Sequence, residues 1–162
     1  GICPDIVIIY AQKEIKENLL VYCDPDVLID RANKLNLPIT LTESESKNPS
    51  ELSIYPIKTS YKVDPGRLDP ANANYVLETI KHATKDCLNG NCEGLLTGPV
   101  NKSVINESGI EFTGHTEFLA KLTETRKTVM LLATDQLKVA LATTHVPLTE
   151  VSKNITQEFY HK

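Results

Sequence analysis

The chain has 162 residues, of which 41% are hydrophobic, so it can form one domain with a substantial core or part of a larger protein. The formal net charge is −4 at pH 7, and the 17 basic residues are scattered among 21 acidic ones, which argues against a nucleic-acid-binding face. No apolar run approaches the roughly 20 residues needed to cross a bilayer, so we expect no membrane-spanning segment.

The first half of the chain alternates helical and strand-like patterns. Pro4 suits a first helical turn, and Asp24 and Asp26 offer N-cap chemistry for a second helix. The apolar spacing predicts helices over 6–15 and 27–35, strands over 19–23, 38–41 and 52–57, and a polar, serine-rich loop over 43–50. Pro56 indicates that the third strand either lies at a sheet edge or ends there.

The second half continues the alternation. Asp69-Pro70 begins the longest predicted helix, which Asn89-Gly90 ends. Further helices are predicted over 101–108, over 116–122 and after Pro147, and further strands over 93–97, 129–133 and 139–143. The last two strands flank a turn near Asp135 and are close enough to pair as a hairpin. The alternation predicts an α/β fold, and the late hairpin predicts a mixed sheet.

Four cysteines are present: Cys3, Cys23, Cys87 and Cys92. The pair Cys87 and Cys92 invites a metal-site or disulfide interpretation, but it lacks the close spacing and the second matching pair of a zinc knuckle. Cys23 ends an apolar run, and Cys87 falls on a helical apolar stripe. We therefore expect ordinary reduced thiols in a cytoplasmic protein.

A first polar cluster follows the predicted strand 93–97. Thr97-Gly98-Pro99 stands at the end of this strand, where open α/β sheets bind ligands. Gly98 allows close backbone approach, and Lys102 could hold a phosphate or carboxylate as a point charge. The simpler interpretation is a plain turn followed by a surface lysine. The spacing is not that of a Walker loop, and no Gly-x-Gly-x-x-Gly fingerprint is present.

His115, Thr116 and His145 are the other candidate site residues. His115 and Thr116 precede or open a predicted helix, whose free backbone amides would bind an anion together with the imidazole and hydroxyl donors. Alternatively, Thr116 is an N-cap and His115 an exposed loop residue. His145 follows an apolar strand, which suits a metal ligand or an acid–base group, although one histidine does not make a site.

The segments 95–102, 104–106, 112–118 and 139–148 together carry a specific resemblance. In their residues and order they resemble the 4-hydroxythreonine-4-phosphate dehydrogenase family of vitamin B6 biosynthesis, and the resemblance covers essentially the whole chain. The start of the chain is similar to the family's first loop and helix, with Cys3 where the family usually has glycine. Because neither end resembles a natural terminus, we expect an N-terminal to central fragment.

The resemblance implies an architecture and a reaction. It implies a two-domain α/β fold similar to isocitrate and isopropylmalate dehydrogenases, with residues 1–108 in the first domain and residues 109–162 opening the second, dimer-forming domain. It also implies a homodimer with its active site in an interdomain cleft. The family oxidises 4-phosphohydroxy-L-threonine with NAD or NADP and a divalent metal (zinc, magnesium or cobalt). The β-keto acid product then decarboxylates to 3-amino-2-oxopropyl phosphate.

Residue by residue, the resemblance implies that His115 and Thr116 bind the substrate and that His145 is the first of three metal histidines. It identifies no general acid or base in this chain. Lys102 is the nearest candidate, and anchoring an anion suits it equally well. Two other functions remain open: a sister dehydrogenase of a phosphorylated four-carbon sugar acid, and a truncated copy without catalytic activity. We expect residues 1–162 alone to be inactive, because the other metal histidines and most of the nucleotide site lie outside them.

Overall fold

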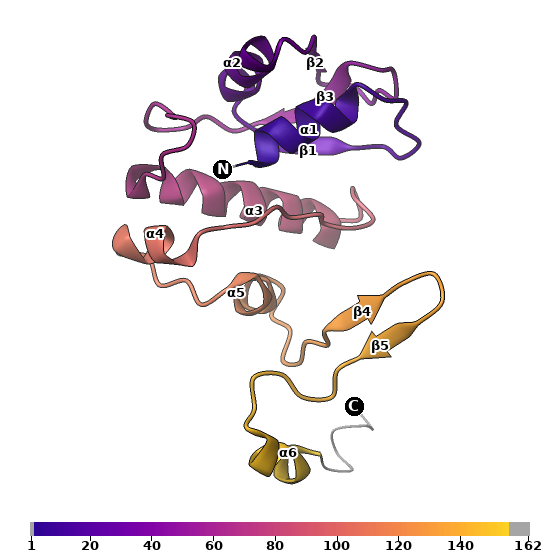
Figure 1. Ribbon diagram of the computed structural model, residues 1–162, viewed down its shortest axis with the longest axis vertical. Coiled ribbons are helices and arrows are strands. Elements are labelled where there is room, and N and C mark those ends of the chain that lie inside the picture. Colours follow the sequence, from indigo (N-terminus) through magenta and orange to yellow (C-terminus); the bar gives the residue numbers. More distant parts are fainter. Residues whose placement is uncertain (1, 156–162) are drawn as a thin grey trace. The chain divides into compact units, whose positions relative to one another are not determined.

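The computed structural model describes residues 2–155, and the chain divides into two compact units after Thr123 (Figure 1). Unit 1 contains α1 (Cys3–Ala11), β1 (Leu20–Cys23), α2 (Pro25–Leu35), β2 (Thr40–Thr42), β3 (Glu51–Pro56), the 3₁₀ helix η1 (Pro70–Asn72), α3 (Ala73–Leu88), α4 (Lys102–Glu107) and α5 (His115–Leu122). Unit 2 contains β4 (Leu131–Ala133), β5 (Lys138–Ala140) and α6 (Leu148–Asn154). Each predicted helix is therefore present, with its ends shifted.

None of the helices in residues 2–155 is long and apolar enough to cross a membrane.

Unit 1 is built around a parallel three-stranded sheet in the order β1-β3-β2. Parallel strands need a crossover connection, and α2 lies on the one between β1 and β2. Apolar side chains of the sheet, α1 and α2 pack into one core: Ile8, Ala11, Cys23, Leu28, Ala32, Leu52 and Ile54. The parallel sheet with its helices confirms the predicted α/β class.

Pro56 ends the central strand of this sheet. β3 pairs with both β1 and β2, so its backbone N–H groups are needed on both sides. Proline lacks that donor, and the ladder stops where Pro56 faces Cys23. Of the two predicted alternatives, the strand end is confirmed and the sheet edge is wrong.

α1 stops at Ala11 and does not continue to Ile15 as predicted, because the residues at its end bond to other parts of the fold. The Ser50 amide donates a hydrogen bond to the Ala11 carbonyl at 2.6 Å, and the Gln12 side chain donates to the Pro38 carbonyl at 3.0 Å. Ile15 is nevertheless buried, with 2% exposure. Its place in the apolar pattern therefore reflects core packing from a loop.

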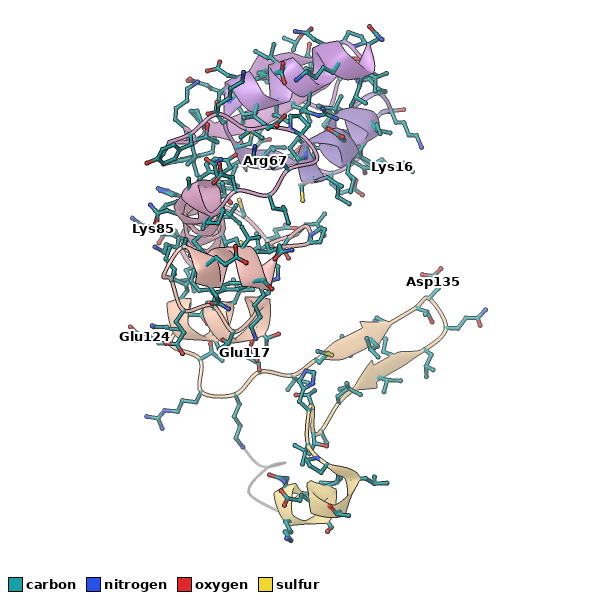
Figure 2. The ribbon with its side chains drawn as sticks, turned by 60° about the vertical axis from the view of Figure 1, so that its left-hand side comes forward. Lys16, Arg67, Lys85, Glu117, Glu124 and Asp135 are labelled. Carbon is teal, nitrogen blue, oxygen red and sulfur yellow. The ribbon has the colours of Figure 1, made fainter. Side chains whose placement is uncertain are left out.

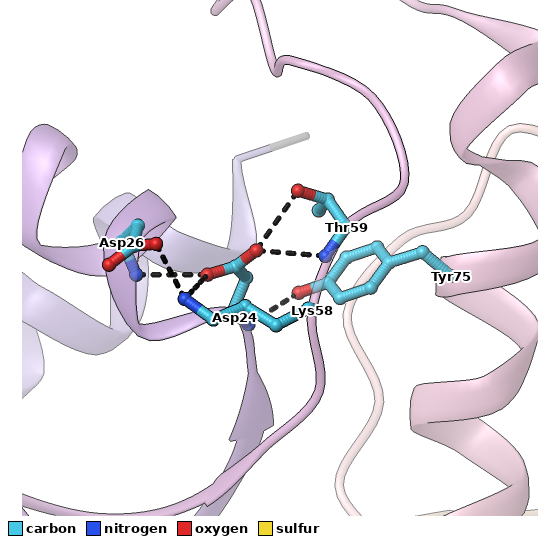
Figure 3. A network of polar contacts seen from close by, with 5 residues as sticks. All are labelled: Asp24, Asp26, Lys58, Thr59 and Tyr75. Atoms are coloured by element: carbon cyan, nitrogen blue, oxygen red, sulfur yellow. Dashed lines mark hydrogen bonds and ion pairs between the residues drawn. The ribbon is translucent and has the colours of Figure 1, made fainter.

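A polar network surrounds Asp24 at the carboxyl end of β1 (Figure 3). The buried Asp24 carboxylate accepts hydrogen bonds from the Asp26 amide at 2.9 Å and from the Thr59 amide and hydroxyl at 2.8 and 3.0 Å. It also meets the Lys58 ammonium at 3.3 Å. The Asp24 amide donates to the Tyr75 hydroxyl at 2.9 Å. This one residue thus joins α2, the segment after β3, and α3.

The surroundings of Asp24 decide its charge. Burial by itself would raise the pKa of this carboxyl group, but the hydrogen bonds from Thr59, Asp26 and Lys58 outweigh burial and hold the pKa below the ordinary value of 3.8. Because the folded-state pKa is the lower one, the charged group stabilises the fold fully above the unfolded value. This stabilisation is lost as the pH falls through the folded value.

Asp24→Ala should lower the free energy of unfolding by about 3 kcal/mol at neutral pH, because it removes an N-cap and leaves the partly buried donors of Asp26 and Thr59 without an acceptor. Urea denaturation of the protein that carries this chain measures the change. The control is Asp30→Ala on the same helix. The exposed Asp30 carboxylate pairs with Lys34, and its loss should change stability by less than about 0.5 kcal/mol. The Asp24→Ala deficit should shrink below pH 3.8, and a deficit independent of pH would contradict the role of the charge.

A second core holds the helices that follow the sheet. It contains Ala73, Leu77, Ile105 and Phe112, with Val100, Ile110 and Phe118 packed at its margin. These residues belong to α3, α4, α5 and the segments that connect them. The second core therefore fixes where α5 begins.

Two predictions about strands are wrong within the described residues. Segment 93–97 forms no strand, and Leu96 within it is 90% exposed. The sheet is not mixed, because β4 and β5 pair with each other in a separate antiparallel sheet. An apolar run predicts that a segment can be buried, but a strand also needs a neighbouring backbone that exchanges hydrogen bonds with it.

The hairpin predicted near Asp135 is confirmed in unit 2. β4 and β5 are shorter than predicted, with three residues each, and Asp135 lies at the tip of their connection (Figure 2). The Thr134 hydroxyl accepts a hydrogen bond from the Leu137 amide at 3.0 Å, which stabilises the turn. Large apolar side chains along the hairpin are exposed: Val129, Met130, Leu131, Leu132, Leu137 and Val139.

Candidate functional site

Lys102 is the first residue of α4, and its side chain is exposed. Asn101 before it caps the helix, with its Oδ1 accepting the Val104 amide at 3.1 Å. This placement suits a lysine that reaches an anion from the surface.

Asn106 of α4 holds the segment that leads into α5. Its side-chain oxygen accepts the Phe112 amide at 2.8 Å. Phe112 is 3% exposed, and its ring meets the His115 ring edge-on, with centroids 6.1 Å apart. Phe118 belongs to α5, like His115, and its ring centroid lies 5.5 Å from that of Phe112. A continuous set of contacts thus links α4 to the His115 ring.

Gly114 is the N-cap residue of α5, and His115 is the first helical residue. Gly114 has a φ of 157°, a backbone conformation that residues with a side chain rarely adopt. Because glycine has no capping side chain, the first amides of α5 have no side-chain cap. His115 Nε2 is buried without a hydrogen-bond partner among the described protein atoms. An unpaired buried nitrogen is costly, so a ligand group that pairs with it would be favoured.

These observations support the ligand-binding interpretation of His115 and Thr116. Thr116 is the second residue of α5, so the alternative that it is the N-cap is wrong. His115 is partly buried in the helix and is not an exposed loop residue. Glu117 lies on the same first turn, and its carboxylate would repel an anion unless a cationic group accompanies it (Figure 2).

Gly98 packs directly against Cys3, the first residue of α1. A Cβ atom at position 98 would stand 2.0 Å from the Cys3 Sγ, so no side chain fits there unless the thiol moves. The predicted close approach at Gly98 is therefore present, but in the described structure it is a contact within the protein. This contact places the turn before Lys102 against the first residue of α1.

His145 lies in unit 2, between β5 and α6. β5 ends at Ala140, so His145 does not directly follow the strand as predicted. Its φ of 57° is in the left-handed region, which is uncommon for residues other than glycine and recurs at functional sites. Within residues 2–155, no three His, Cys, Asp or Glu side chains gather closely enough to hold a metal ion. A catalytic zinc centre usually takes three protein ligands, so His145 can supply only one member of such a set.

A sequence model of the family described as pyridoxal phosphate biosynthetic protein PdxA matches residues 15–162. The chain belongs to the PdxA family. Two similar relatives are both named 4-hydroxythreonine-4-phosphate dehydrogenase. The one from Yersinia pseudotuberculosis serotype O:1b is 45% identical over 168 aligned positions, and the one from Saccharophagus degradans is 46% identical over 161. The alignments cover 100% and 96% of this PdxA chain but 51% and 48% of the relatives, so the chain spans about half the length of the curated relatives it matches.

Solved structures with this fold carry the same enzyme name. A crystal structure of 4-hydroxythreonine-4-phosphate dehydrogenase from Klebsiella pneumoniae matches with a TM-score of 0.82 and 27% identity, over 98% of this chain and 51% of that one. One from Burkholderia phymatum has a TM-score of 0.84 at 22% identity, over the same shares, and supports the fold alone. The resemblance to this enzyme family is therefore confirmed.

Sequence reasoning missed Asn106, Phe112 and Glu117 as residues that shape the first turn of α5 in this PdxA chain. A glycine before His115 was a usable signal, because an N-cap without a side chain leaves helix amides uncapped. The sequence offered no comparable signal for the contact between Asn106 and Phe112, which depends on the angle at which the chain leaves α4.

Proposed function

We propose that the protein carrying this chain oxidises 4-phosphohydroxy-L-threonine, with NAD or NADP and a divalent metal, in pyridoxal phosphate biosynthesis. The β-keto acid formed would decarboxylate to 3-amino-2-oxopropyl phosphate. The observation that carries the proposal is the PdxA family match over residues 15–162, together with 45% identity to a relative named 4-hydroxythreonine-4-phosphate dehydrogenase.

His115 and Thr116 are proposed to bind the substrate. The uncapped amides of α5, the Thr116 hydroxyl and the unpartnered His115 Nε2 are donors that suit a phosphate or carboxylate group. Lys102 is proposed to attract an anionic group. His145 is proposed as one metal ligand, with the rest of the set outside the described residues. A divalent ion there would act as a Lewis acid on the substrate oxygens, and histidine ligands favour zinc over magnesium.

The proposal includes the assembly of the whole protein. It comprises a two-domain fold similar to isocitrate and isopropylmalate dehydrogenases, divided near residue 108, a homodimer, and a cytoplasmic location. The exposed apolar side chains of the β4–β5 hairpin support further protein contacts in the complete molecule, because patches of this kind are usually covered.

One observation bears on the alternative substrate, a phosphorylated four-carbon sugar acid. The Glu117 carboxylate stands on the first turn of α5, beside the proposed substrate-binding pair. An amino-acid substrate brings an ammonium group that would balance this charge, whereas a sugar acid has a hydroxyl group in its place. Glu117 therefore favours the amino-acid substrate.

The test is a substrate comparison on the full-length protein. Reduction of NAD and of NADP is followed with 4-phosphohydroxy-L-threonine and with threonate 4-phosphate, each with zinc, magnesium or cobalt. We expect metal-dependent turnover with the amino acid. Turnover with the sugar acid alone would establish the sister dehydrogenase, and no turnover with either would support the non-catalytic copy.

Thr116→Ala and His115→Ala should each lower kcat/KM. Losing a hydrogen bond to a charged substrate group costs roughly 1.5–3 kcal/mol, which corresponds to roughly a ten- to hundredfold decrease. Steady-state kinetics on the full-length variants measure it. The matched control is Thr79→Ala on α3. The Thr79 hydroxyl donates to the Val76 carbonyl of its own helix at 2.7 Å, so this substitution should leave kcat/KM unchanged. Wild-type kinetics in both site variants would mean that these residues only start a helix.

A further inference from the structure

The end of α3 turns back on itself and brings Cys92 beside the helix. Gly90, with a φ of 77°, reverses the chain. The amides of Gly90 and Asn91 donate to the carbonyls of Cys87 and Asp86 at 3.1 and 2.9 Å, which closes the helix as a Schellman motif. The Cys92 amide also donates to the Asp86 carbonyl, at 3.4 Å. Since that carbonyl belongs to the peptide bond between Asp86 and Cys87, the backbones of the two cysteines lie next to each other.

The Cys92 side chain lies on the Asp86 side of this turn. The Cys92 Sγ is 3.8 Å from the Tyr22 hydroxyl, which donates to the Asp86 carboxylate at 2.6 Å. Cys87 and Cys92 are both free thiols and both partly exposed, so a small reagent can reach them. Burial raises the pKa of the Cys87 thiol, and the nearby charges of Cys92 and Asp86 raise it further.

This pair does not suit a metal ion. A structural zinc site takes four ligands, and residues 2–155 contain no cluster of three His, Cys, Asp or Glu side chains. The hydrogen bond from the Cys92 amide to the Asp86 carbonyl instead brings the two cysteine backbones together, and close approach of the two backbones is what a disulfide bond requires. Cys92 is the partner expected for Cys87, because the Cys92 backbone is hydrogen-bonded to the last turn of α3.

We propose that Cys87 and Cys92 form a reversible intramolecular disulfide on exposure to a low-molecular-weight disulfide. One cysteine thiolate attacks the reagent, forms a mixed disulfide and releases one reagent thiolate. The second cysteine thiolate attacks the protein sulfur of that mixed disulfide and releases the other. The protein loses two protons and two electrons, and the reagent gains them as two thiols. The new bond ties the end of α3 to the segment that leads to Lys102.

The test oxidises the full-length protein in glutathione redox buffers, alkylates the remaining thiols with iodoacetamide and digests with trypsin. Cleavage after Lys85 and Lys102 leaves both cysteines in one peptide, residues 86–102. The disulfide appears as that peptide without alkyl groups and lighter by two hydrogen atoms. Its equilibrium constant should be at least about tenfold higher in the native protein than in urea, because the fold raises the effective concentration of one thiol near the other.

Single variants complete the test. Cys92→Ser and Cys87→Ser should each abolish the unalkylated peptide, and Cys3→Ser should leave it unchanged. The proposal is overturned if both cysteines are recovered alkylated, if each retains glutathione, or if the bond joins two molecules. It is also overturned if the equilibrium constant is the same in native protein and in urea.

Discussion

His145→Ala is expected to reduce the metal-dependent turnover of the full-length protein by at least about a thousandfold, because it removes one of the three ligands that a catalytic metal centre usually needs. The fold should survive, since the His145 side chain is exposed. His145→Asn should behave in the same way. It keeps a residue that tolerates the left-handed backbone conformation at this position but removes the imidazole. Turnover and bound metal, measured on the same preparations, give the result.

His82→Ala is the matched control for the loss of a histidine. His82 lies on α3, and its ring packs 5.2 Å from the Tyr55 ring, so its removal should leave metal content and turnover at the wild-type level. Normal metal affinity and rate in His145→Ala would show that the metal ligands lie elsewhere.

Residues 1–162 expressed alone are expected to show no dehydrogenase activity. The residues that the structure describes contain no three-ligand metal cluster, and the chain spans about half the length of the relatives it matches. The exposed apolar hairpin of unit 2 should also promote aggregation of the isolated chain.

The experiment purifies the soluble part of this chain and assays reduction of NAD and NADP with 4-phosphohydroxy-L-threonine and added zinc, magnesium or cobalt. The full-length protein in the same assay is the positive control. Metal-dependent turnover that persists through purification from host enzymes would show that the site is complete within these residues.

Local patterns predicted most of the fold because the relevant physics is local. Asp24 was expected to cap α2, and it does, since N-capping depends on residues that are neighbours in sequence. The strand over 93–97 and the mixed sheet were wrong because pairing depends on which backbone lies alongside. The contacts of Gln12 and Ser50 at the end of α1 are also non-local. The apolar spacing up to Ile15 therefore could not predict that the helix ends at Ala11.

In the candidate site, too, local features were predicted from the sequence and non-local ones were not. The helix that begins near Thr116 was visible in the sequence, and so was the glycine before it. The buried His115 Nε2 and the support from Phe112 were not, because both depend on how α4 and α5 pack. The roles of His115, Thr116 and His145 came from the family resemblance and stay predictions.

The contact between Gly98 and Cys3 makes the order of evolutionary substitutions matter. While Cys3 is present, a methyl group at position 98 would overlap its sulfur, so Gly98→Ala would be deleterious unless the thiol rotates away. Without the Cys3 side chain, the same change at position 98 would meet open space. The effect of a substitution at position 98 therefore depends on which residue stands at position 3, so the two positions are epistatic.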